Sequence, residues 1–232
     1  EKYRRIAETA QMQPGDQVLE IGCGWGGFAE YAVKNVGVNM TCITISQEQH
    51  DFAAQRFQRE GISDKIELRL QDYRDTEEGR YDRVASIEMI EAVGEPYWDT
   101  YFGQIAKVLK PGGAAAIQAI TIPDDTCEDY MSKVDFISRY IFPGGRLLSH
   151  GKMKECTERA GMHYEPNGDY AKSYAKTLLH WNDKFQEAWT NIRTLGFDER
   201  FKRMWEYYLI HCSVCFDFEQ IGVAQTRLQK PA

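Results

Sequence analysis

The chain has 232 residues, enough for one large domain or two small ones. Hydrophobic residues make up 43% and charged residues 27%, as in an ordinary globular protein, so the composition excludes a disordered or fibrous chain. The formal net charge of −7 argues against a nucleic-acid partner and against simple electrostatic attraction to an anionic membrane. No apolar run approaches the ~20 residues of a membrane-spanning helix.

Short apolar or β-branched segments alternate with helical stretches through the first half of the chain. The predicted strands are residues 17–21, 39–45, 65–70, 82–87 and 113–121, and the predicted helices are residues 26–34, 47–59 and 98–109. Strands and helices that alternate at this spacing form a parallel sheet with helices on both faces. The sequence therefore predicts a doubly wound α/β fold.

The pattern changes after residue 121. Aromatic-rich helical segments are predicted at 131–140, 152–160, 174–195 and 199–216, followed by a strand at 220–228. We expect a single domain in which residues 1–122 form the ligand-binding core. Residues 123–216 are expected to form a mainly helical cover over the carboxyl ends of the strands, where open α/β sheets bind ligands. Residues 217–232 are expected to return to the sheet as an antiparallel strand.

Six cysteines are scattered along the chain, which predicts reduced thiols in a cytoplasmic protein and no disulfide framework. The one C-x-x-C pair, Cys212 and Cys215, lies inside a predicted helix, where buried cysteines are the simpler interpretation. We therefore predict no metal site.

A glycine-rich segment, EIGCGWGG from Glu20 to Gly27, joins the first predicted strand to the first helix. Glycines there allow a tight turn and let the backbone approach a ligand closely. A dinucleotide site and a plain strand–helix turn are the competing interpretations of such a segment. The candidate ligand-binding residues are Glu20, Gly22, Cys23, Gly24 and Gly26.

Polar residues after the next two strands favour a nucleotide of another kind. The acid Glu20 directly precedes the first glycine, and a hydrogen-bonding and stacking set suited to an adenine edge follows the third strand. After the second strand, polar side chains stand where an acid usually holds a ribose. The residues concerned are Thr44, Ser46 and Gln49 after the second strand and Gln71, Asp72 and Tyr73 after the third. In this combination the chain resembles class I methyltransferases, which bind S-adenosylmethionine.

From Val18 almost to its end, the chain resembles the cyclopropane fatty acid synthase family. The first segment that carries the resemblance is shared in outline by many methyltransferases, and the others, in this order and spacing, are more specific. The segments are 18–28 (VLEIGCGWGGF), 43–49 (ITISQEQ), 71–75 (QDYRD), 89–94 (MIEAVG), 140–145 (YIFPGG) and 199–209 (ERFKRMWEYYL).

The resemblance implies transfer of a methyl group from S-adenosylmethionine to a carbon of a cis double bond in an acyl chain, usually on a phospholipid. The resulting carbocation loses a proton from the new methyl group and closes to a cyclopropane. The family pattern implies that Glu91, Tyr174 and the backbone of Ile120 help to hold a bicarbonate ion that accepts this proton. Aromatic side chains attract cations to their ring faces, so the aromatic-rich cover fits a carbocation pathway.

Three positions depart from the family pattern. Gln118 replaces a histidine at the end of the fifth strand, Ala92 replaces the histidine after the glutamate, and Glu88 stands where many members have a small residue. Gln118 can donate and accept hydrogen bonds but cannot titrate. We therefore hypothesise that Glu88 or Glu91 takes over part of the bicarbonate function, with a protein carboxylate as the base.

The resemblance implies an unsaturated fatty acyl or phospholipid partner and peripheral contact with the inner face of the cytoplasmic membrane, and it leaves a homodimer open. The family also carries a cysteine-containing segment before these motifs, and part of the lipid-binding surface is expected there. The alternatives are a related enzyme with a methyl-branched, methylene or furan-precursor product, a small-molecule N-methyltransferase, and a non-catalytic binding module.

Overall fold

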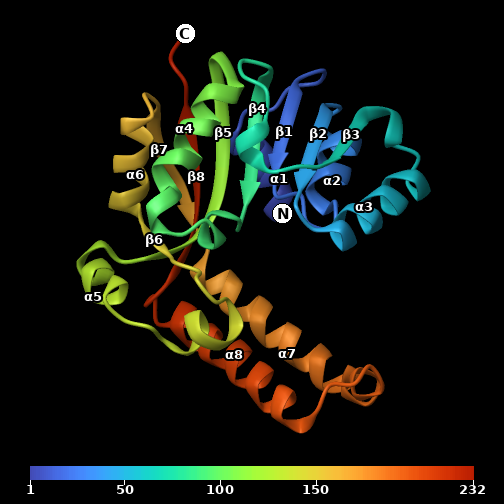
Figure 1. Ribbon diagram of the computed structural model, residues 1–232, viewed down its shortest axis with the longest axis vertical. Coiled ribbons are helices and arrows are strands. Elements are labelled where there is room, and N and C mark those ends of the chain that lie inside the picture. The colour runs from blue at the N-terminus through green and yellow to red at the C-terminus, as the bar shows by residue number, and fades with distance from the viewer.

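One eight-stranded sheet forms the centre of the molecule in the computed structural model, which describes residues 1–232 (Figure 1). The strands lie in the order β3-β2-β1-β4-β5-β8-β7, with β6 paired to β5 off this path. Strand β8 runs antiparallel to both of its neighbours, β5 and β7, and all other strand pairs are parallel, which confirms the predicted C-terminal antiparallel strand. The bounds are β1 Gln17–Ile21, β2 Asn39–Thr44, β3 Ile66–Leu70, β4 Tyr81–Ile87, β5 Leu109–Ile122, β6 Leu148–Ser149, β7 His163–Asp169 and β8 Gly222–Gln229.

Helices cover both faces of the sheet, which confirms the predicted doubly wound class. One apolar core joins β1, β2 and β4 to the first three helices, and a second joins the other face to α4 and α6. These helices are α1 Lys2–Thr9, α2 Gly27–Asn35, α3 Gln47–Arg59, α4 Trp98–Val108 and α6 His150–Arg159. Burial of these two cores is the main stabilising contribution to the fold.

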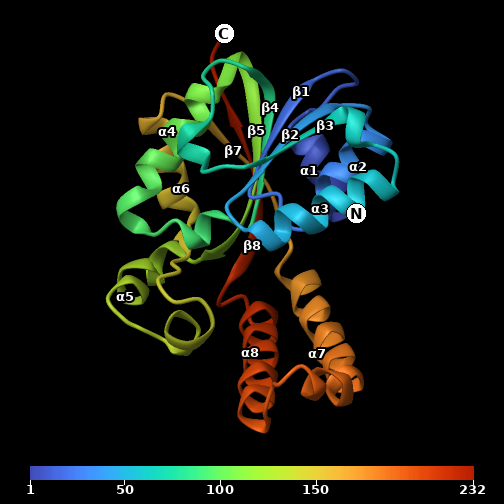
Figure 2. The same cartoon turned by 45° about the vertical axis from the view of Figure 1, so that its right-hand side comes forward.

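A long helical hairpin, α7 (Ala171–Thr194) and α8 (Glu199–Asp217), projects from the sheet at the carboxyl ends of its parallel strands (Figures 1 and 2). Its base forms a third apolar core, in which Ala175 and Phe216 pack with Val223 of β8 and with Ile120 of β5. The hairpin is therefore anchored on the edge of the sheet where ligands of open α/β folds bind.

The structure corrects the prediction of a helix over residues 131–140. Helix α5 spans only Cys127–Met131, and a π-helical turn spans Ile137–Ile141. Between them the Asp135 carboxylate accepts a hydrogen bond from the backbone N–H of Ser138 at 2.8 Å. This side-chain bond stands in for part of the helical backbone pairing and favours a turn at this point.

Two elements carry little sequence signal. Strand β7 contains Pro166 and Gly168, which disfavour a central strand, and it is tolerated because it lies at the sheet edge with a register shift at these residues. Helix α1 begins at the second residue of the chain. No helix has the length and apolar character needed to cross a bilayer.

Candidate active site

The turn after β1 contains three glycines, of which Gly22 and Gly26 are closely packed against side chains and Gly24 is not. The backbone φ angles of Gly22, Gly24 and Gly26 are 77°, 53° and 77°, in the left-handed region that favours glycine. A Cβ atom on Gly22 would lie 2.9 Å from Met89, and one on Gly26 would lie 2.7 Å from the Phe57 ring. A Cβ atom on Gly24 would meet nothing within 4 Å. Gly24 is therefore the glycine whose backbone a ligand could approach.

The side chains of Glu20 and Cys23 lie beneath this turn. Glu20 is only 2% exposed, its carboxylate lies 3.8 Å from the Cys42 thiol, and burial raises its pKa well above the usual range. Cys23 is also buried, and its N–H donates to the Ile43 carbonyl at 3.0 Å. Both side chains are therefore buried, and the carboxylate of Glu20 faces Cys42 on the neighbouring strand β2.

The loop after β2 is held by its own polar side chains. The Thr44 hydroxyl donates to the Gln49 side-chain oxygen at 2.8 Å and accepts from the Ser46 N–H at 3.2 Å. Ser46 also caps α3, since its hydroxyl accepts from the Gln49 N–H at 3.3 Å. These contacts bring the three residues together beside the glycine turn, because β2 is the direct neighbour of β1.

The predicted residues after β3 lie next along the same edge. The N–H of Gln71 donates to the Thr44 carbonyl at 2.9 Å, which ties this loop to the previous one. Arg74 donates to both carboxylate oxygens of Asp72 at 2.9 and 2.7 Å, and this pairing lowers the pKa of Asp72. The Tyr73 ring packs edge-on against Tyr101 at 5.7 Å. The open position at Gly24 and the two polar loops together fit S-adenosylmethionine.

Beyond β4, three side chains donate hydrogen bonds to the Glu88 carboxylate. They are the Lys2 ammonium at 2.6 Å, the Gln118 amide at 2.6 Å and the Tyr174 hydroxyl at 2.5 Å. Glu88 has a φ angle of 53°, unusual for a residue with a side chain. Four distant segments, α1, β4, β5 and α7, therefore meet at one carboxylate.

Glu91 lies in a single 3-10 turn, Ile90–Ala92, directly after this position. The N–H of Ile120 donates to its Oε1 atom at 2.6 Å, and its Oε2 atom is buried without a partner. Burial, with a smaller contribution from the charge of Glu88, raises the pKa of Glu91 to about 7. The site therefore holds two carboxyl groups in different environments, Glu88 with three donors and Glu91 with one donor on a single oxygen.

The bicarbonate ion implied by the family resemblance does not fit this arrangement. The hydroxyl of Tyr174 and the amide of Gln118 already donate to Glu88, and the N–H of Ile120 already donates to Glu91. An added anion would lie near two carboxyl groups and would first have to displace these bonds. Of the donors that the resemblance assigns to bicarbonate, the Tyr174 hydroxyl is taken up by Glu88 and the Ile120 N–H by Glu91.

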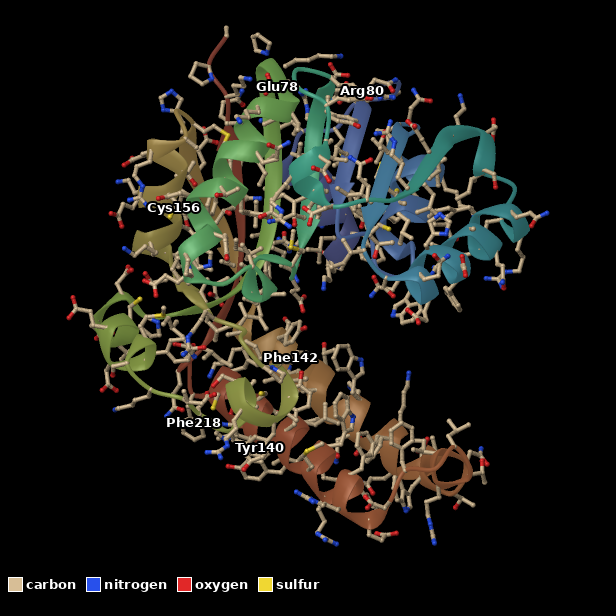
Figure 3. All side chains as sticks on the ribbon, viewed as in Figure 1. Glu78, Arg80, Tyr140, Phe142, Cys156 and Phe218 are labelled. Carbon is tan, nitrogen blue, oxygen red and sulfur yellow. The ribbon has the colours of Figure 1, made fainter.

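Aromatic rings surround this polar cluster. The Tyr174 ring packs against Phe216 at 4.9 Å and Trp181 at 6.2 Å, and Phe142 packs against Tyr208 at 5.9 Å. Figure 3 shows Tyr140 and Phe142 on the segment beside α8. The negative ring faces of such a group can stabilise a cation that forms nearby.

Sequence reasoning missed Lys2 and Gln225. Lys2 carried no signal, because a single lysine outside any motif is ordinarily a solvated side chain. Gln225 interrupts the apolar part of β8 and could have been noticed there, since a buried amide in a strand needs partners. Its partner is Gln118, whose Oε1 atom accepts from Gln225 at 2.9 Å.

We expect Glu91→Gln to change how stability depends on pH. Because the pKa of Glu91 in the fold is about 7, against 4.5 for an exposed glutamate, the folded chain keeps a proton that the unfolded chain releases. Glu91 therefore stabilises the wild-type fold less as pH rises from about 4.5 to about 7, by up to about 3 kcal/mol in total.

Thermal denaturation from about pH 4.5 to about pH 8 measures this effect. The wild type should lose stability relative to Glu91→Gln across that window, and the difference should then stay constant. A difference that does not vary with pH would show that Glu91 titrates normally.

The chain is similar to proteins that modify fatty acyl chains. It is 38% identical to the tuberculostearic acid methyltransferase UfaA1 of Mycobacterium tuberculosis over 98% of its own length and 53% of that protein. It is 36% identical to the cyclopropane-fatty-acyl-phospholipid synthase of Escherichia coli, over 97% of its own length and 56% of that protein. The chain therefore spans about half the length of these two relatives.

Solved structures and a family model give the same result. The crystal structure of the mycolic acid cyclopropane synthase CmaA1 in complex with SAH and CTAB matches 99% of this chain and 83% of that one, with a TM-score of 0.89 and 27% identity. The cyclopropane synthase MmaA2 from Mycobacterium tuberculosis matches over the same shares, with a TM-score of 0.89 and 25% identity. The family model for mycolic acid cyclopropane synthetase matches residues 1–226. The chain therefore belongs to the mycolic acid cyclopropane synthetase family, a family of class I S-adenosylmethionine methyltransferases.

Proposed function

We propose that this protein transfers a methyl group from S-adenosylmethionine to a carbon of a cis double bond in an unsaturated acyl chain and forms a cyclopropane. We propose a phospholipid as the carrier of that acyl chain. The observation that carries the proposal is the pair of carboxyl groups, Glu88 and Glu91, at the carboxyl edge of the sheet under an aromatic hairpin. Family membership and the open glycine position support the same activity.

When bound, S-adenosylmethionine supplies an electrophilic methyl group. An alkene is a weak nucleophile, so the protein contributes chiefly by holding the two reactants in line and excluding water. We assign the binding role to the Gly24 backbone and to the side chains of Thr44, Gln49 and Gln71. The aromatic rings beside Tyr174 would stabilise the carbocation on the acyl chain.

We assign the role of base to Glu88. Its carboxylate would accept a proton from the new methyl group, and the electron pair of that C–H bond would close the ring onto the cationic carbon. Tyr174, Gln118 and Lys2 orient the carboxylate through their hydrogen bonds. The Lys2 side chain is 42% exposed, so it links Glu88 to solvent, where the accepted proton can leave.

A second candidate is a methylene product, the precursor of a methyl-branched chain. A hydride shift would move the positive charge onto the methylated carbon, and loss of a methyl proton would then leave a C=CH₂ group. The 38% identity to a tuberculostearic acid methyltransferase supports this outcome. Reduction to the methyl branch would need a separate reductant.

Label transfer tests the proposal. The protein is incubated with S-adenosylmethionine that carries a CD₃ group and with vesicles of an unsaturated phosphatidylglycerol or phosphatidylethanolamine. We expect mass spectrometry to find two deuterium atoms in the acyl chain, because the base removes the third one from the transferred CD₃ group as D⁺. Ozonolysis cleaves a methylene group and spares a cyclopropane, so it separates the two candidates.

Absence of label from the lipid would contradict the proposed activity and favour a binding module, and label on a small amine would favour an N-methyltransferase. Since the substrate lies in a bilayer, we also propose peripheral contact with the inner face of the cytoplasmic membrane, to be measured by co-sedimentation with the same vesicles. A homodimer, tested by light scattering, is compatible with this arrangement.

A further inference from the structure

Two buried glutamines face each other across neighbouring strands at the edge of the candidate site. Gln118 of β5 is 2% exposed and Gln225 of β8 is 1% exposed, and they are direct partners in the antiparallel register. Most other buried residues of these two strands are apolar. A buried amide is costly unless its polar atoms are paired, so this pair needs a reason beyond packing.

The hydrogen bonds of the pair run in one direction across the sheet. The Gln225 Nε2 atom donates to Gln118 Oε1 at 2.9 Å, and the Gln118 Nε2 atom donates to Glu88 Oε1 at 2.6 Å. Gln225 Oε1 is buried without a partner. Strands β8 and β5 thus contribute one residue each, and the chain of donors ends on the carboxylate of Glu88, directly after β4.

We infer that Gln225 is a positioning residue for Glu88, acting through Gln118. An amide group can point either its oxygen or its nitrogen at a neighbour. Because Gln225 donates to the oxygen of Gln118, the nitrogen of Gln118 must face Glu88. Without Gln225, Gln118 could rotate, and its oxygen would then repel the carboxylate. Gln225 thereby fixes the position of the Glu88 carboxylate that accepts the proton. This inference rests on the proposed function.

Adjacent Thr226 offers a matched control. It is also 1% exposed and also makes one side-chain hydrogen bond to β5, from its hydroxyl to the Ile117 carbonyl at 3.5 Å. Side chains alternate along a strand, so Thr226 points to the opposite face of the sheet from Gln225. Thr226→Val therefore removes a buried hydrogen bond from the same strand without touching the chain of donors.

The test compares kcat for labelled methyl transfer in Gln225→Met, Gln118→Met, the double variant and Thr226→Val. We expect Gln225→Met to lower kcat about tenfold, equivalent to ~1.4 kcal/mol, with the Kd for S-adenosylmethionine unchanged within about twofold. The double variant should be no slower than Gln118→Met, because the effect passes through Gln118. Thr226→Val should keep the wild-type kcat.

The inference is overturned if the effects of the two glutamine variants multiply, if Gln225→Met keeps the wild-type kcat, or if Thr226→Val is equally slow. Should Gln225→Met not fold, Gln225→Asn provides a second variant. It retains a buried amide, but its shorter side chain moves the N–H donor away from Gln118, so it should show the same loss of kcat. Gln225→His, which retains a ring N–H donor, should recover part of the rate.

A readout without catalysis separates this inference from the proposed function. In a ¹H–¹⁵N NMR spectrum, the side-chain amide signals of Gln118 are identified by their loss in Gln118→Met. Gln225→Met should shift these signals, because the amide loses its orientation toward Glu88, and Thr226→Val should leave them in place. Unshifted signals in Gln225→Met would overturn the inference even if the wild type transfers no methyl group to lipid.

Discussion

Glu88→Gln is expected to lower turnover by at least about 100-fold while S-adenosylmethionine still binds. The amide keeps the size of the side chain but cannot accept the proton that ring closure releases. Added bicarbonate should not restore activity, because the amide side chain would still fill the space between Tyr174, Gln118 and Lys2. Wild-type turnover, in turn, should be the same in bicarbonate-depleted buffer and after bicarbonate is added.

For Glu88→Gly we expect the opposite effect of bicarbonate on turnover. Removing the side chain frees the Tyr174 hydroxyl and the Gln118 amide as donors, so bicarbonate should rescue this variant. Glycine also suits the φ angle of 53° at this position, so the melting temperature should not fall for lack of a permitted backbone conformation. Exposed Glu95, in a 3-10 turn after Gly94, provides a control, and Glu95→Gln should keep full activity. Strong stimulation of the wild type by bicarbonate would contradict Glu88 as the base.

Gly24→Leu is expected to abolish binding of S-adenosylmethionine. No atom lies within 4 Å of a Cβ atom placed on Gly24, so the leucine side chain would occupy the space that we assign to the cofactor. The loss should appear in calorimetry as the absence of measurable heat at cofactor concentrations that saturate the wild type.

The variant also places a side chain at a φ angle of 53°, which costs stability on its own. Gly112→Leu controls for this cost. Gly112 has a φ angle of 72° and equally open surroundings, and it lies at the opposite end of β5 from the site. Both variants should melt at lower temperatures than the wild type, and only Gly24→Leu should lose the cofactor. Tight binding by folded Gly24→Leu would show that the ligand does not approach this glycine.

The elements of the fold differ in how well the local sequence predicted them. The strands from β1 to β4 and helix α3 were predicted within about one residue, because hydrophobic periodicity and turn residues act over a few neighbours. Edge strand β7 was missed, since pairing with β8 outweighs the local preferences of Pro166 and Gly168. The helix predicted at 131–140 was wrong, because the bond from the Ser138 N–H to Asp135 favours a turn there, and Phe136 packs against Tyr207 of α8.

The candidate site, too, was predicted only in part from the sequence. Motif spacing led to the glycine turn and to the two polar loops. The family resemblance led to Glu88, Glu91, Gln118, Ile120 and Tyr174 as candidates, and the roles of all these residues stay predictions. The tertiary structure decided which atoms meet. Lys2 and Tyr174, far apart in the chain, both donate to Glu88, and Gln225 orients Gln118 across the sheet.

Sequence by itself therefore determined the fold class and the family of this protein, because the fold class rests on local alternation of strand and helix patterns and the family on short motifs in a fixed order. Only the tertiary structure decided that the donors expected for bicarbonate are already bonded to Glu88 and Glu91. Hydrogen bonds depend on distances of about 3 Å between atoms, and such distances are set by how strands and helices pack, not by how residues follow one another.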